Sequence, residues 1–392
     1  MKMSKSFKYR LRPTPEQQEK LGQWAGSCRF LYNRFLDQRI KTYQETGKSL
    51  SYVDQANQLP ALKKELNWLT EPPSQALQQT LKDLEQAFKN FFRRIKQGGE
   101  AAGFPRFKKK GFSDSFRLPQ LKETAVLGEG KHGKVVLPKI GAVKFIKSRE
   151  IEGRIRNITI SRTCDNWYIS FNCEIEKEIA VNKGHGIGID RGIAHTITTS
   201  DGKFYDIPEK SLEYWEGRLI QAQRKLARQQ KKSNNCKKQK QRIGKLHHKI
   251  AEIRNDFLHK VSTDIAKNHS YIVLEELKTK NMTRTAKGTI EKPGKNVKAK
   301  AGLNKAILMQ GWHKFQTMLE YKTVWFGSFV DYVKPHYTSQ KCSKCGNIAK
   351  ENRKTQNTFK CQSCGYKENA DINAAINIFT DGLSGRACGD AA

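Results

Sequence analysis

The chain has 392 residues, with 73 Lys and Arg against 38 Asp and Glu, which gives a formal charge of +35. A surplus of this size repels itself in a compact fold, so it predicts a polyanionic partner and disfavours a merely soluble basic protein. No signal peptide and no apolar run long enough to span a membrane are visible, so we expect a cytoplasmic protein.

Residues 1 to about 110 predict a short strand followed by a small helical unit. Residues Thr14 to Gln17 predict the start of a helix, because Thr14 can cap the helix and Gln17 completes a capping box. Apolar residues then recur at spacings of three and four, which predicts one buried face: Leu21, Trp24, Cys28, Leu31 and Phe35. A second helix is expected from Ser74, with a core stripe of Leu77, Leu81, Leu84, Phe88, Phe91 and Ile95.

Two features of this region are candidate nucleic-acid contacts. The other face of the second helix carries Gln75, Gln79 and Lys82, which either touch DNA bases or face water. Amide side chains can pair with adenine edges, so Gln75 and Gln79 are candidate readers of a short DNA motif. Residues 98–117 alternate phenylalanines with cations that include Arg106 and Lys108. This composition suits base stacking, or phenylalanines that pack on a neighbouring domain.

The rest of the chain predicts a β-rich segment and then an α/β region. Residues 118–181 alternate β-branched and aromatic residues between turns, which favours a small β-barrel, with a hairpin tip at Asp165-Asn166. From about residue 183 strands and helices alternate. Residues 211–268 predict long basic helices suited to a nucleic-acid groove, and residues 278–305 predict a mobile basic loop. A core helix is then expected to carry Leu308, Trp312, Phe315 and Leu319.

Four cysteines predict a structural zinc site. Cys342-x-x-Cys345 is followed by Cys361-x-x-Cys364, and a glycine follows each pair. Four thiolates at this spacing close a tetrahedral Zn²⁺ site with no open position for chemistry. Two disulfides are the rival interpretation, but they would suit a secreted protein. The other five cysteines are scattered, and we expect them to be reduced thiols.

Three carboxylates predict a second metal site. Asp190 ends an apolar strand, Glu275 ends another buried strand, and Asp371 opens a helix with the expected core stripe Ile372, Ala375, Ile376 and Phe379. The positive end of that helix favours an ionised Asp371. Glu275 is preferred over Glu276, because alternation sends Glu276 to the opposite face. Clustered carboxylates can hold two Mg²⁺ ions, which promote phosphodiester cleavage.

The sequence resembles the TnpB family, the RNA-guided nucleases of insertion sequences that are related to type V CRISPR effectors. The motifs that carry the resemblance span nearly the whole chain: FKYRLRPTPEQ, GSCRFLYNR, SQALQQTLKDLEQAFKNFF, GFPRFKKK, LPKIGAVK, GIDRGI, VLEEL, TSQKCSKCG, FKCQSCGY, NADINAAINI and GRACG. By these motifs, Asp190, Glu275 and Asp371 match the family's RuvC carboxylates, and the four cysteines match its zinc knuckle.

The resemblance implies a multidomain α/β plus β-barrel fold. It places an N-terminal wedge β-barrel at residues 1–14 and 98–182, with a helical recognition insertion at 15–97. It places an RNase H-like (RuvC) nuclease domain at 183–335 and 367–392, with a zinc-ribbon insert at 336–366. It also implies a guide RNA from the element end and cleavage of double-stranded DNA beside a short adjacent motif, with one chain per guide RNA favoured.

Two other functions fit the same residues. A protein-guided transposase or resolvase of the RNase H-like class would explain the carboxylates equally well, but not the dispersed positive charge or the N-terminal half. A guided repressor that binds without cutting would explain the scaffold, but not three intact carboxylates.

Overall fold

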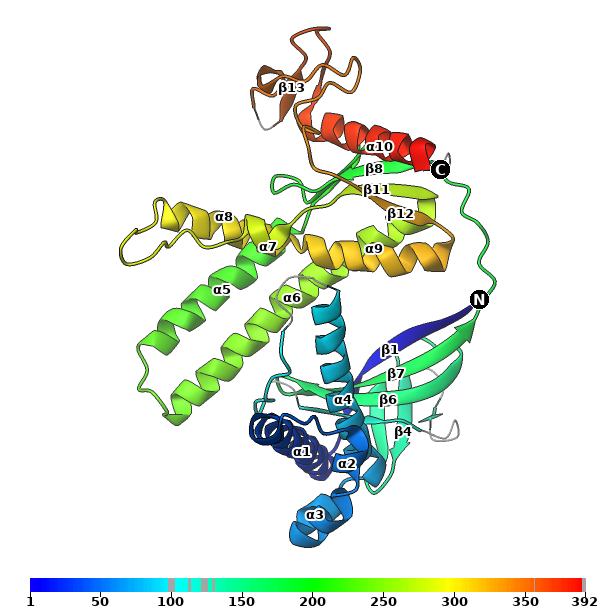
Figure 1. Cartoon of the computed structure of the whole chain (residues 1–392), viewed down its shortest axis with the longest axis vertical. Coiled ribbons are helices and arrows are strands. Elements are labelled where there is room, and N and C mark those ends of the chain that lie inside the picture. The colour runs from blue at the N-terminus through cyan, green and yellow to red at the C-terminus, as the bar shows by residue number, and fades with distance from the viewer. Residues whose placement is uncertain (98–102, 112–113, 121–125, 129–130, 356, 390–392) are drawn as a thin grey trace. The chain divides into compact units, whose positions relative to one another are not determined.

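The structure is a computed structural model that describes residues 1–97, 103–111, 114–120, 126–128, 131–355 and 357–389. The chain divides into two compact units, Met1–Glu178 and Ile179–Ala392, which are treated separately below (Figure 1). In the part of the chain described, no helix is long and apolar enough to cross a membrane.

The first unit contains a curled antiparallel sheet of seven strands in the order β2-β6-β7-β1-β5-β4-β3 (Figure 1). The strands are β1 (Lys2–Arg12), β2 (Ser115–Leu118), β3 (Val126–Leu127), β4 (His132–Leu137), β5 (Gly141–Ile146), β6 (Arg154–Thr163) and β7 (Asn166–Glu176). The predicted hairpin tip is one residue off, because Thr163 pairs with Asn166 and leaves Cys164-Asp165 as the turn. Cys164 has a φ of 54°, which a two-residue hairpin turn requires.

A helical segment enters this unit between β1 and β2. It comprises α1 (Pro15–Thr46), α2 (Tyr52–Ala56), α3 (Leu59–Glu65), a 3₁₀ turn at Asn67–Thr70 and α4 (Ser74–Lys96). The Thr14–Gln17 capping box is present, and all five residues of the predicted α1 face are buried. The predicted α4 stripe is right at Leu77, Leu81 and Leu84 but wrong at its end, because Ile95 is 53% exposed.

The second unit is built on a five-stranded sheet in the order β10-β9-β8-β11-β12. The strands are β8 (Ile187–Asp190), β9 (Ile197–Thr199), β10 (Phe204–Tyr205), β11 (Tyr271–Glu275) and β12 (Phe329–Val333). β8, β11 and β12 run parallel, and the antiparallel hairpin β9-β10 turns through Asp201-Gly202. Helix α10 (Ala370–Gly389) covers one face, where Ile378 packs on Val273.

Other helices cover the opposite face of this sheet. α6 (Asn234–Asn268) and α9 (Trp312–Phe326) pack Leu258, Ile265 and Phe315 against Ile187 and Ile189. α5 (Glu209–Ala227) and α6 form the expected pair of basic helices, which extends beyond the sheet (Figure 1).

Two predictions for residues 278–326 are wrong. The expected loop contains α7 (Thr279–Met282) and the start of α8 (Val297–Gln310), because residues 297–310 are rich in alanine, leucine and lysine, which favour helix. The expected single core helix is instead divided into two helices, α8 and α9, because Gly311 between them has a φ of 70°. Leu308 therefore lies outside the core and is 61% exposed.

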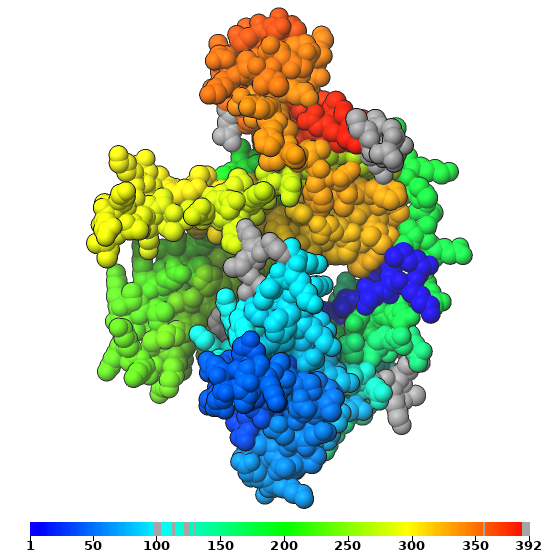
Figure 2. Space-filling view, viewed as in Figure 1, coloured from blue at the N-terminus to red at the C-terminus, as the bar shows by residue number. Residues whose placement is uncertain are grey.

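Residues 336–355 and 357–369 and the start of α10 form a small ribbon with strands β13 (Thr358–Lys360) and β14 (Lys367–Asn369). Its own core is Cys342, Phe359, Cys361 and Ala370. In Figure 2 it is a separate orange lobe beside the red helix α10. A core this small indicates a fold that depends on metal.

Candidate active site

Asp190 and Glu275 end two neighbouring strands. β11 runs parallel to β8, with Leu274 paired to Ile189, so Glu275 and Asp190 are the next residues along each strand. Adjacent strands lie about 4.8 Å apart, and in-register residues of parallel strands point to the same face. The two carboxylates are therefore neighbours on one face of the sheet.

Gly188 identifies that face as the one that α10 covers. A Cβ at Gly188 would lie 2.1 Å from the carbonyl oxygen of Ala375, so only glycine allows the helix to approach this closely. Asp190 is two residues further on and points to the same side. Glu275 is buried and Glu276 is exposed, in keeping with the choice of Glu275 as the inward residue.

Asp371 brings the third carboxylate from the first turn of α10. The side chain of Asn369 accepts hydrogen bonds from the backbone N–H groups of Asp371 and Ile372, which starts the helix at this point. Asp371 is 4% exposed, and Arg353 Nη2 donates to its Oδ1 at 3.0 Å. The predicted apolar stripe of α10 is partly wrong, because Asn373, Asn377 and Ile378 are more deeply buried than Ile376.

The electrostatics of Asp190 show that the three groups influence one another. Burial, and then the charges of Glu275 and Asp371, raise the pKa of Asp190 to about 7, while the backbone N–H of Arg191 and the charge of Arg353 act in the opposite direction. Asp190 nevertheless keeps part of its surface accessible. A carboxyl held this way binds either a proton or a cation.

Three further side chains at this site were not predicted as site residues, although Arg191 and Thr338 lie in the quoted motifs GIDRGI and TSQKCSKCG. Thr338 Oγ1 donates to Glu275 Oε1, and the buried Arg191 donates from Nη2 to the Glu275 backbone carbonyl. Arg353 reaches Asp371 from the ribbon. An arginine in a chain this basic is inconspicuous, and only the fold brings Thr338 and Arg353 to carboxylates that are distant in the sequence.

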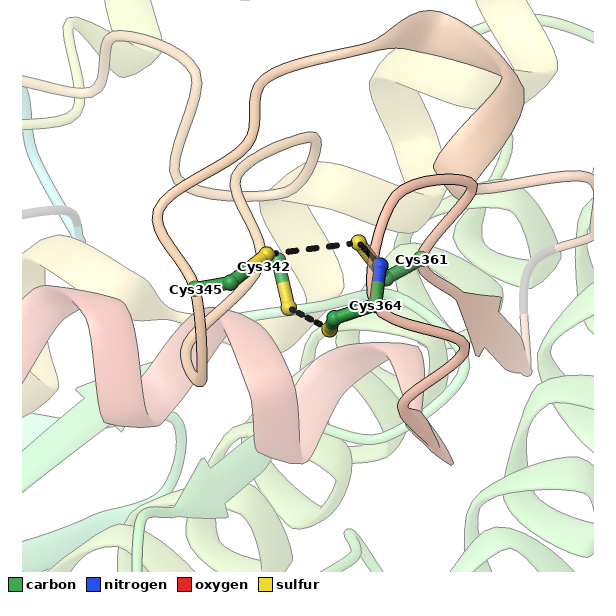
Figure 3. A group of neighbouring side chains, drawn as sticks. All are labelled: Cys342, Cys345, Cys361 and Cys364. Carbon is green, nitrogen blue, oxygen red and sulfur yellow. Dashed lines mark hydrogen bonds between the residues drawn. The ribbon is translucent and has the colours of Figure 1, made fainter.

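The four predicted cysteines meet in one cluster (Figure 3). Cys342 Sγ lies 3.7 Å from Cys364 Sγ, and Cys345 Sγ lies 3.5 Å from Cys361 Sγ. These separations are too long for disulfides, and they fit the roughly 3.8 Å between ligands of a tetrahedral zinc with 2.3 Å Zn–S bonds. The backbone N–H of Cys364 donates to Cys361 and lowers the pKa of that thiol, which favours the thiolate that zinc binds.

The predicted nucleic-acid-binding residues all belong to the first unit, whereas the three carboxylates belong to the second. Gln75 and Lys82 are exposed on α4, and Arg106 is exposed. Gln79 donates to Asp83, which leaves its amide oxygen for other partners. Lys108 is less suited to bind phosphate, because it lies over the ring of Tyr32 and burial lowers its pKa. Phe104 is 45% exposed, Phe116 belongs to the core, and Phe112 lies outside the described residues.

Comparison with known proteins identifies the family. The chain is 44% identical over 393 residues to "Putative RNA-guided DNA endonuclease InsQ" of Escherichia coli (strain K12), covering 100% of this chain and 95% of that protein. The chain belongs to the TnpB family. A second member, "Putative RNA-guided DNA endonuclease" of Streptomyces pristinaespiralis, is 31% identical and covers 99% of this chain and 92% of its own length.

Three family models match different parts of this TnpB-family chain. "Helix-turn-helix domain" matches residues 1–48, which fold here as β1 and α1. "Probable transposase" matches residues 170–286, which include Asp190 and Glu275, and "Cas12f1-like, TNB domain" matches residues 312–378, which include the ribbon. Among solved structures, "the mini-RNA-guided endonuclease CRISPR-Cas_phi3" aligns with a TM-score of 0.51 at 10% identity, over 97% of this chain and 92% of that one. The expected fold class is thereby confirmed.

Any divalent cation that the three carboxylates bind would compete with a proton, so its affinity is expected to depend on pH. Because the pKa of Asp190 is about 7, a cation must displace a proton from it below that pH. We expect the affinity for Mn²⁺, measured by isothermal titration calorimetry, to rise up to about tenfold per pH unit between pH 5.5 and 7 and to level off above pH 8. An affinity that is flat across this window would contradict the assignment.

Proposed function

We propose that the chain is an RNA-guided DNA endonuclease that hydrolyses phosphodiester bonds at Asp190, Glu275 and Asp371 with the aid of Mg²⁺. The proposal depends on one observation, the convergence of two strand-end carboxylates and a helix-start carboxylate within range of one another's charge. Hard oxygen ligands of this kind suit Mg²⁺. The 44% identical relative InsQ carries the name of the same activity.

The three carboxylates would hold the metal ions, of which two are expected. When bound, such ions would supply an activated water and would stabilise the charge on the leaving oxygen of the phosphodiester. α10 and the strand ends fix the carboxylates on rigid elements, which limits how far they can move when the substrate binds. The guanidinium of Arg353, which bonds Asp371, is a group that recognises phosphate oxygens, so it would help to orient the scissile phosphate.

The partners would be a guide RNA from the element end and double-stranded target DNA, with one chain per guide RNA. α5 and α6 supply much of the charge, since residues 221–260 hold thirteen Lys and Arg against two acids. Such a surface holds a heteroduplex by its shape and phosphates, while base pairing supplies sequence choice. We also propose the domain boundaries given in the sequence analysis. The zinc ion that the ribbon would bind has a structural role in this proposal.

The guided activity is tested with the chain purified from cells that also transcribe its element. A discrete RNA should copurify, and its sequence should define the guide. Loaded with that RNA and Mg²⁺, the protein should cut a plasmid library with randomised bases beside the target, and only plasmids that carry one short motif should be lost. Sequencing the survivors then gives the motif.

The alternative outcomes separate the rival functions. Cutting that survives complete removal of RNA would favour a protein-guided transposase or resolvase, in line with the profile named "Probable transposase". Guided binding without Mg²⁺-dependent cutting would favour a non-cleaving repressor.

A further inference from the structure

We propose that Thr338 is a positioning residue that fixes Glu275 for metal binding, and that α10 in turn fixes Thr338. The proposal rests on the proposed function, because it concerns the same carboxylates. It makes the first residues of the zinc ribbon part of the active-site geometry.

The hydrogen bond between Thr338 and Glu275 has only one possible direction. An ionised carboxylate only accepts hydrogen bonds, so the Thr338 hydroxyl must donate to Glu275 Oε1. Thr338 is 5% exposed and Glu275 is 8% exposed, so little water reaches either side chain to take over this bond. The bond occupies Oε1 and leaves Oε2 as the oxygen better placed to bind a metal ion. Partners of this kind fix the orientation of a metal-binding carboxylate.

Two asparagines of α10 hold the backbone that carries Thr338. Asn377 Nδ2 donates to the carbonyl oxygens of Thr338 at 2.9 Å and Lys341 at 2.7 Å. Asn373 Nδ2 also donates to the Lys341 carbonyl, at 2.9 Å, and its Oδ1 accepts from the backbone N–H of Ser343. Buried amides inside a helix are costly unless they are bonded, and both of these have found partners in residues 338–343.

The same helix begins with Asp371, so α10 connects two carboxylates. It carries Asp371 directly, and it fixes Glu275 through Asn377 and Thr338. Lys341 Nζ adds an ion pair with Asp381 at 2.8 Å further along α10. A displacement of residues 338–341 would therefore move the hydroxyl that bonds Glu275, although those residues contain none of the three carboxylates.

The test compares Thr338→Val, which keeps the shape of the side chain but removes the hydroxyl, with Thr338→Ser, which keeps the hydroxyl. Thr323→Val is the matched control, because Thr323 is 2% exposed in α9 and donates only within its own helix. In Thr338→Val we expect Mn²⁺ affinity, measured by calorimetry, to fall by about tenfold and guided cleavage at limiting Mg²⁺ to fall by about 10- to 100-fold. Thr338→Ser should stay within about threefold of the wild type.

Zinc content, the unfolding midpoint and guided DNA binding of Thr338→Val should match those of Thr323→Val. The proposal is overturned if the two valine variants bind Mn²⁺ equally well. It is also overturned if cleavage by Thr338→Val falls only in proportion to lost zinc or lost folded protein, because Thr338 would then be merely structural. A wild-type chain that binds no Mn²⁺ would instead refute the proposed function itself.

Discussion

Replacing Asp190 by asparagine is expected to abolish guided cleavage, lowering the rate by roughly 10³-fold or more while target binding persists. The amide keeps the size of the side chain but removes the anionic oxygen that a divalent ion requires. Binding is expected to persist because the basic helices α5 and α6 are untouched. The measurement is single-turnover cleavage alongside a gel-shift assay with the same guide and target.

The same substitution is expected to stabilise the metal-free protein. The folded pKa of Asp190, about 7, lies above its unfolded value near 3.8, so the folded state binds more protons between these values. Stability therefore falls as pH rises from about 4 to 7 and then stays level. Asparagine removes this penalty, so at pH 8 the free energy of unfolding should rise on the order of 1–3 kcal/mol. If Asp190→Asn and the wild type were equally stable at pH 8, burial and the charges of Glu275 and Asp371 would not destabilise an ionised Asp190 in the folded protein.

The sequence predicted the parts of the fold that short-range patterns specify. The face of α1 followed from residues three and four apart, and the strand-end positions of Asp190 and Glu275 followed from two apolar runs that each end in an acid. The pattern on α4 could not show where its neighbours end, so Ile95 was wrongly placed in the core. Gly311 was visible, but its positive φ, which separates α8 from α9, depends on the packing around it.

The residues that support the site could not be predicted for a physical reason. Thr338 is 63 residues from Glu275 in the chain, and Arg353 is 18 residues from Asp371. Their contacts exist only because the ribbon folds back over the start of α10. Neither residue belongs to a periodic pattern, and one arginine among 73 Lys and Arg carries no local information.

Removing the zinc is expected to disable cleavage without unfolding the second unit. The ribbon core has four buried residues, two of them zinc-binding cysteines, so the ribbon should unfold when the metal is lost. Arg353 would then release Asp371, and Thr338, which would keep only its bond to Asn377 of α10, would hold Glu275 less firmly. The sheet core around Ile189, Leu258 and Phe315 contains no ribbon residue and should remain. In Cys361→Ser we expect cleavage to fall by about 10²-fold or more and zinc content to fall well below one per chain.

Cys236→Ser is the matched control, because Cys236 is also buried but lies in α6, far along the chain from the four-cysteine cluster. It should keep its zinc and its cleavage rate. Limited proteolysis should cut Cys361→Ser between residues 340 and 366 and leave the rest of the second unit intact, since unfolding confined to the ribbon exposes only that segment. If Cys361→Ser lost its zinc but cleaved at the wild-type rate, the ribbon would have no part in holding the carboxylates. The hydrogen bond from Arg353 would then be incidental to catalysis.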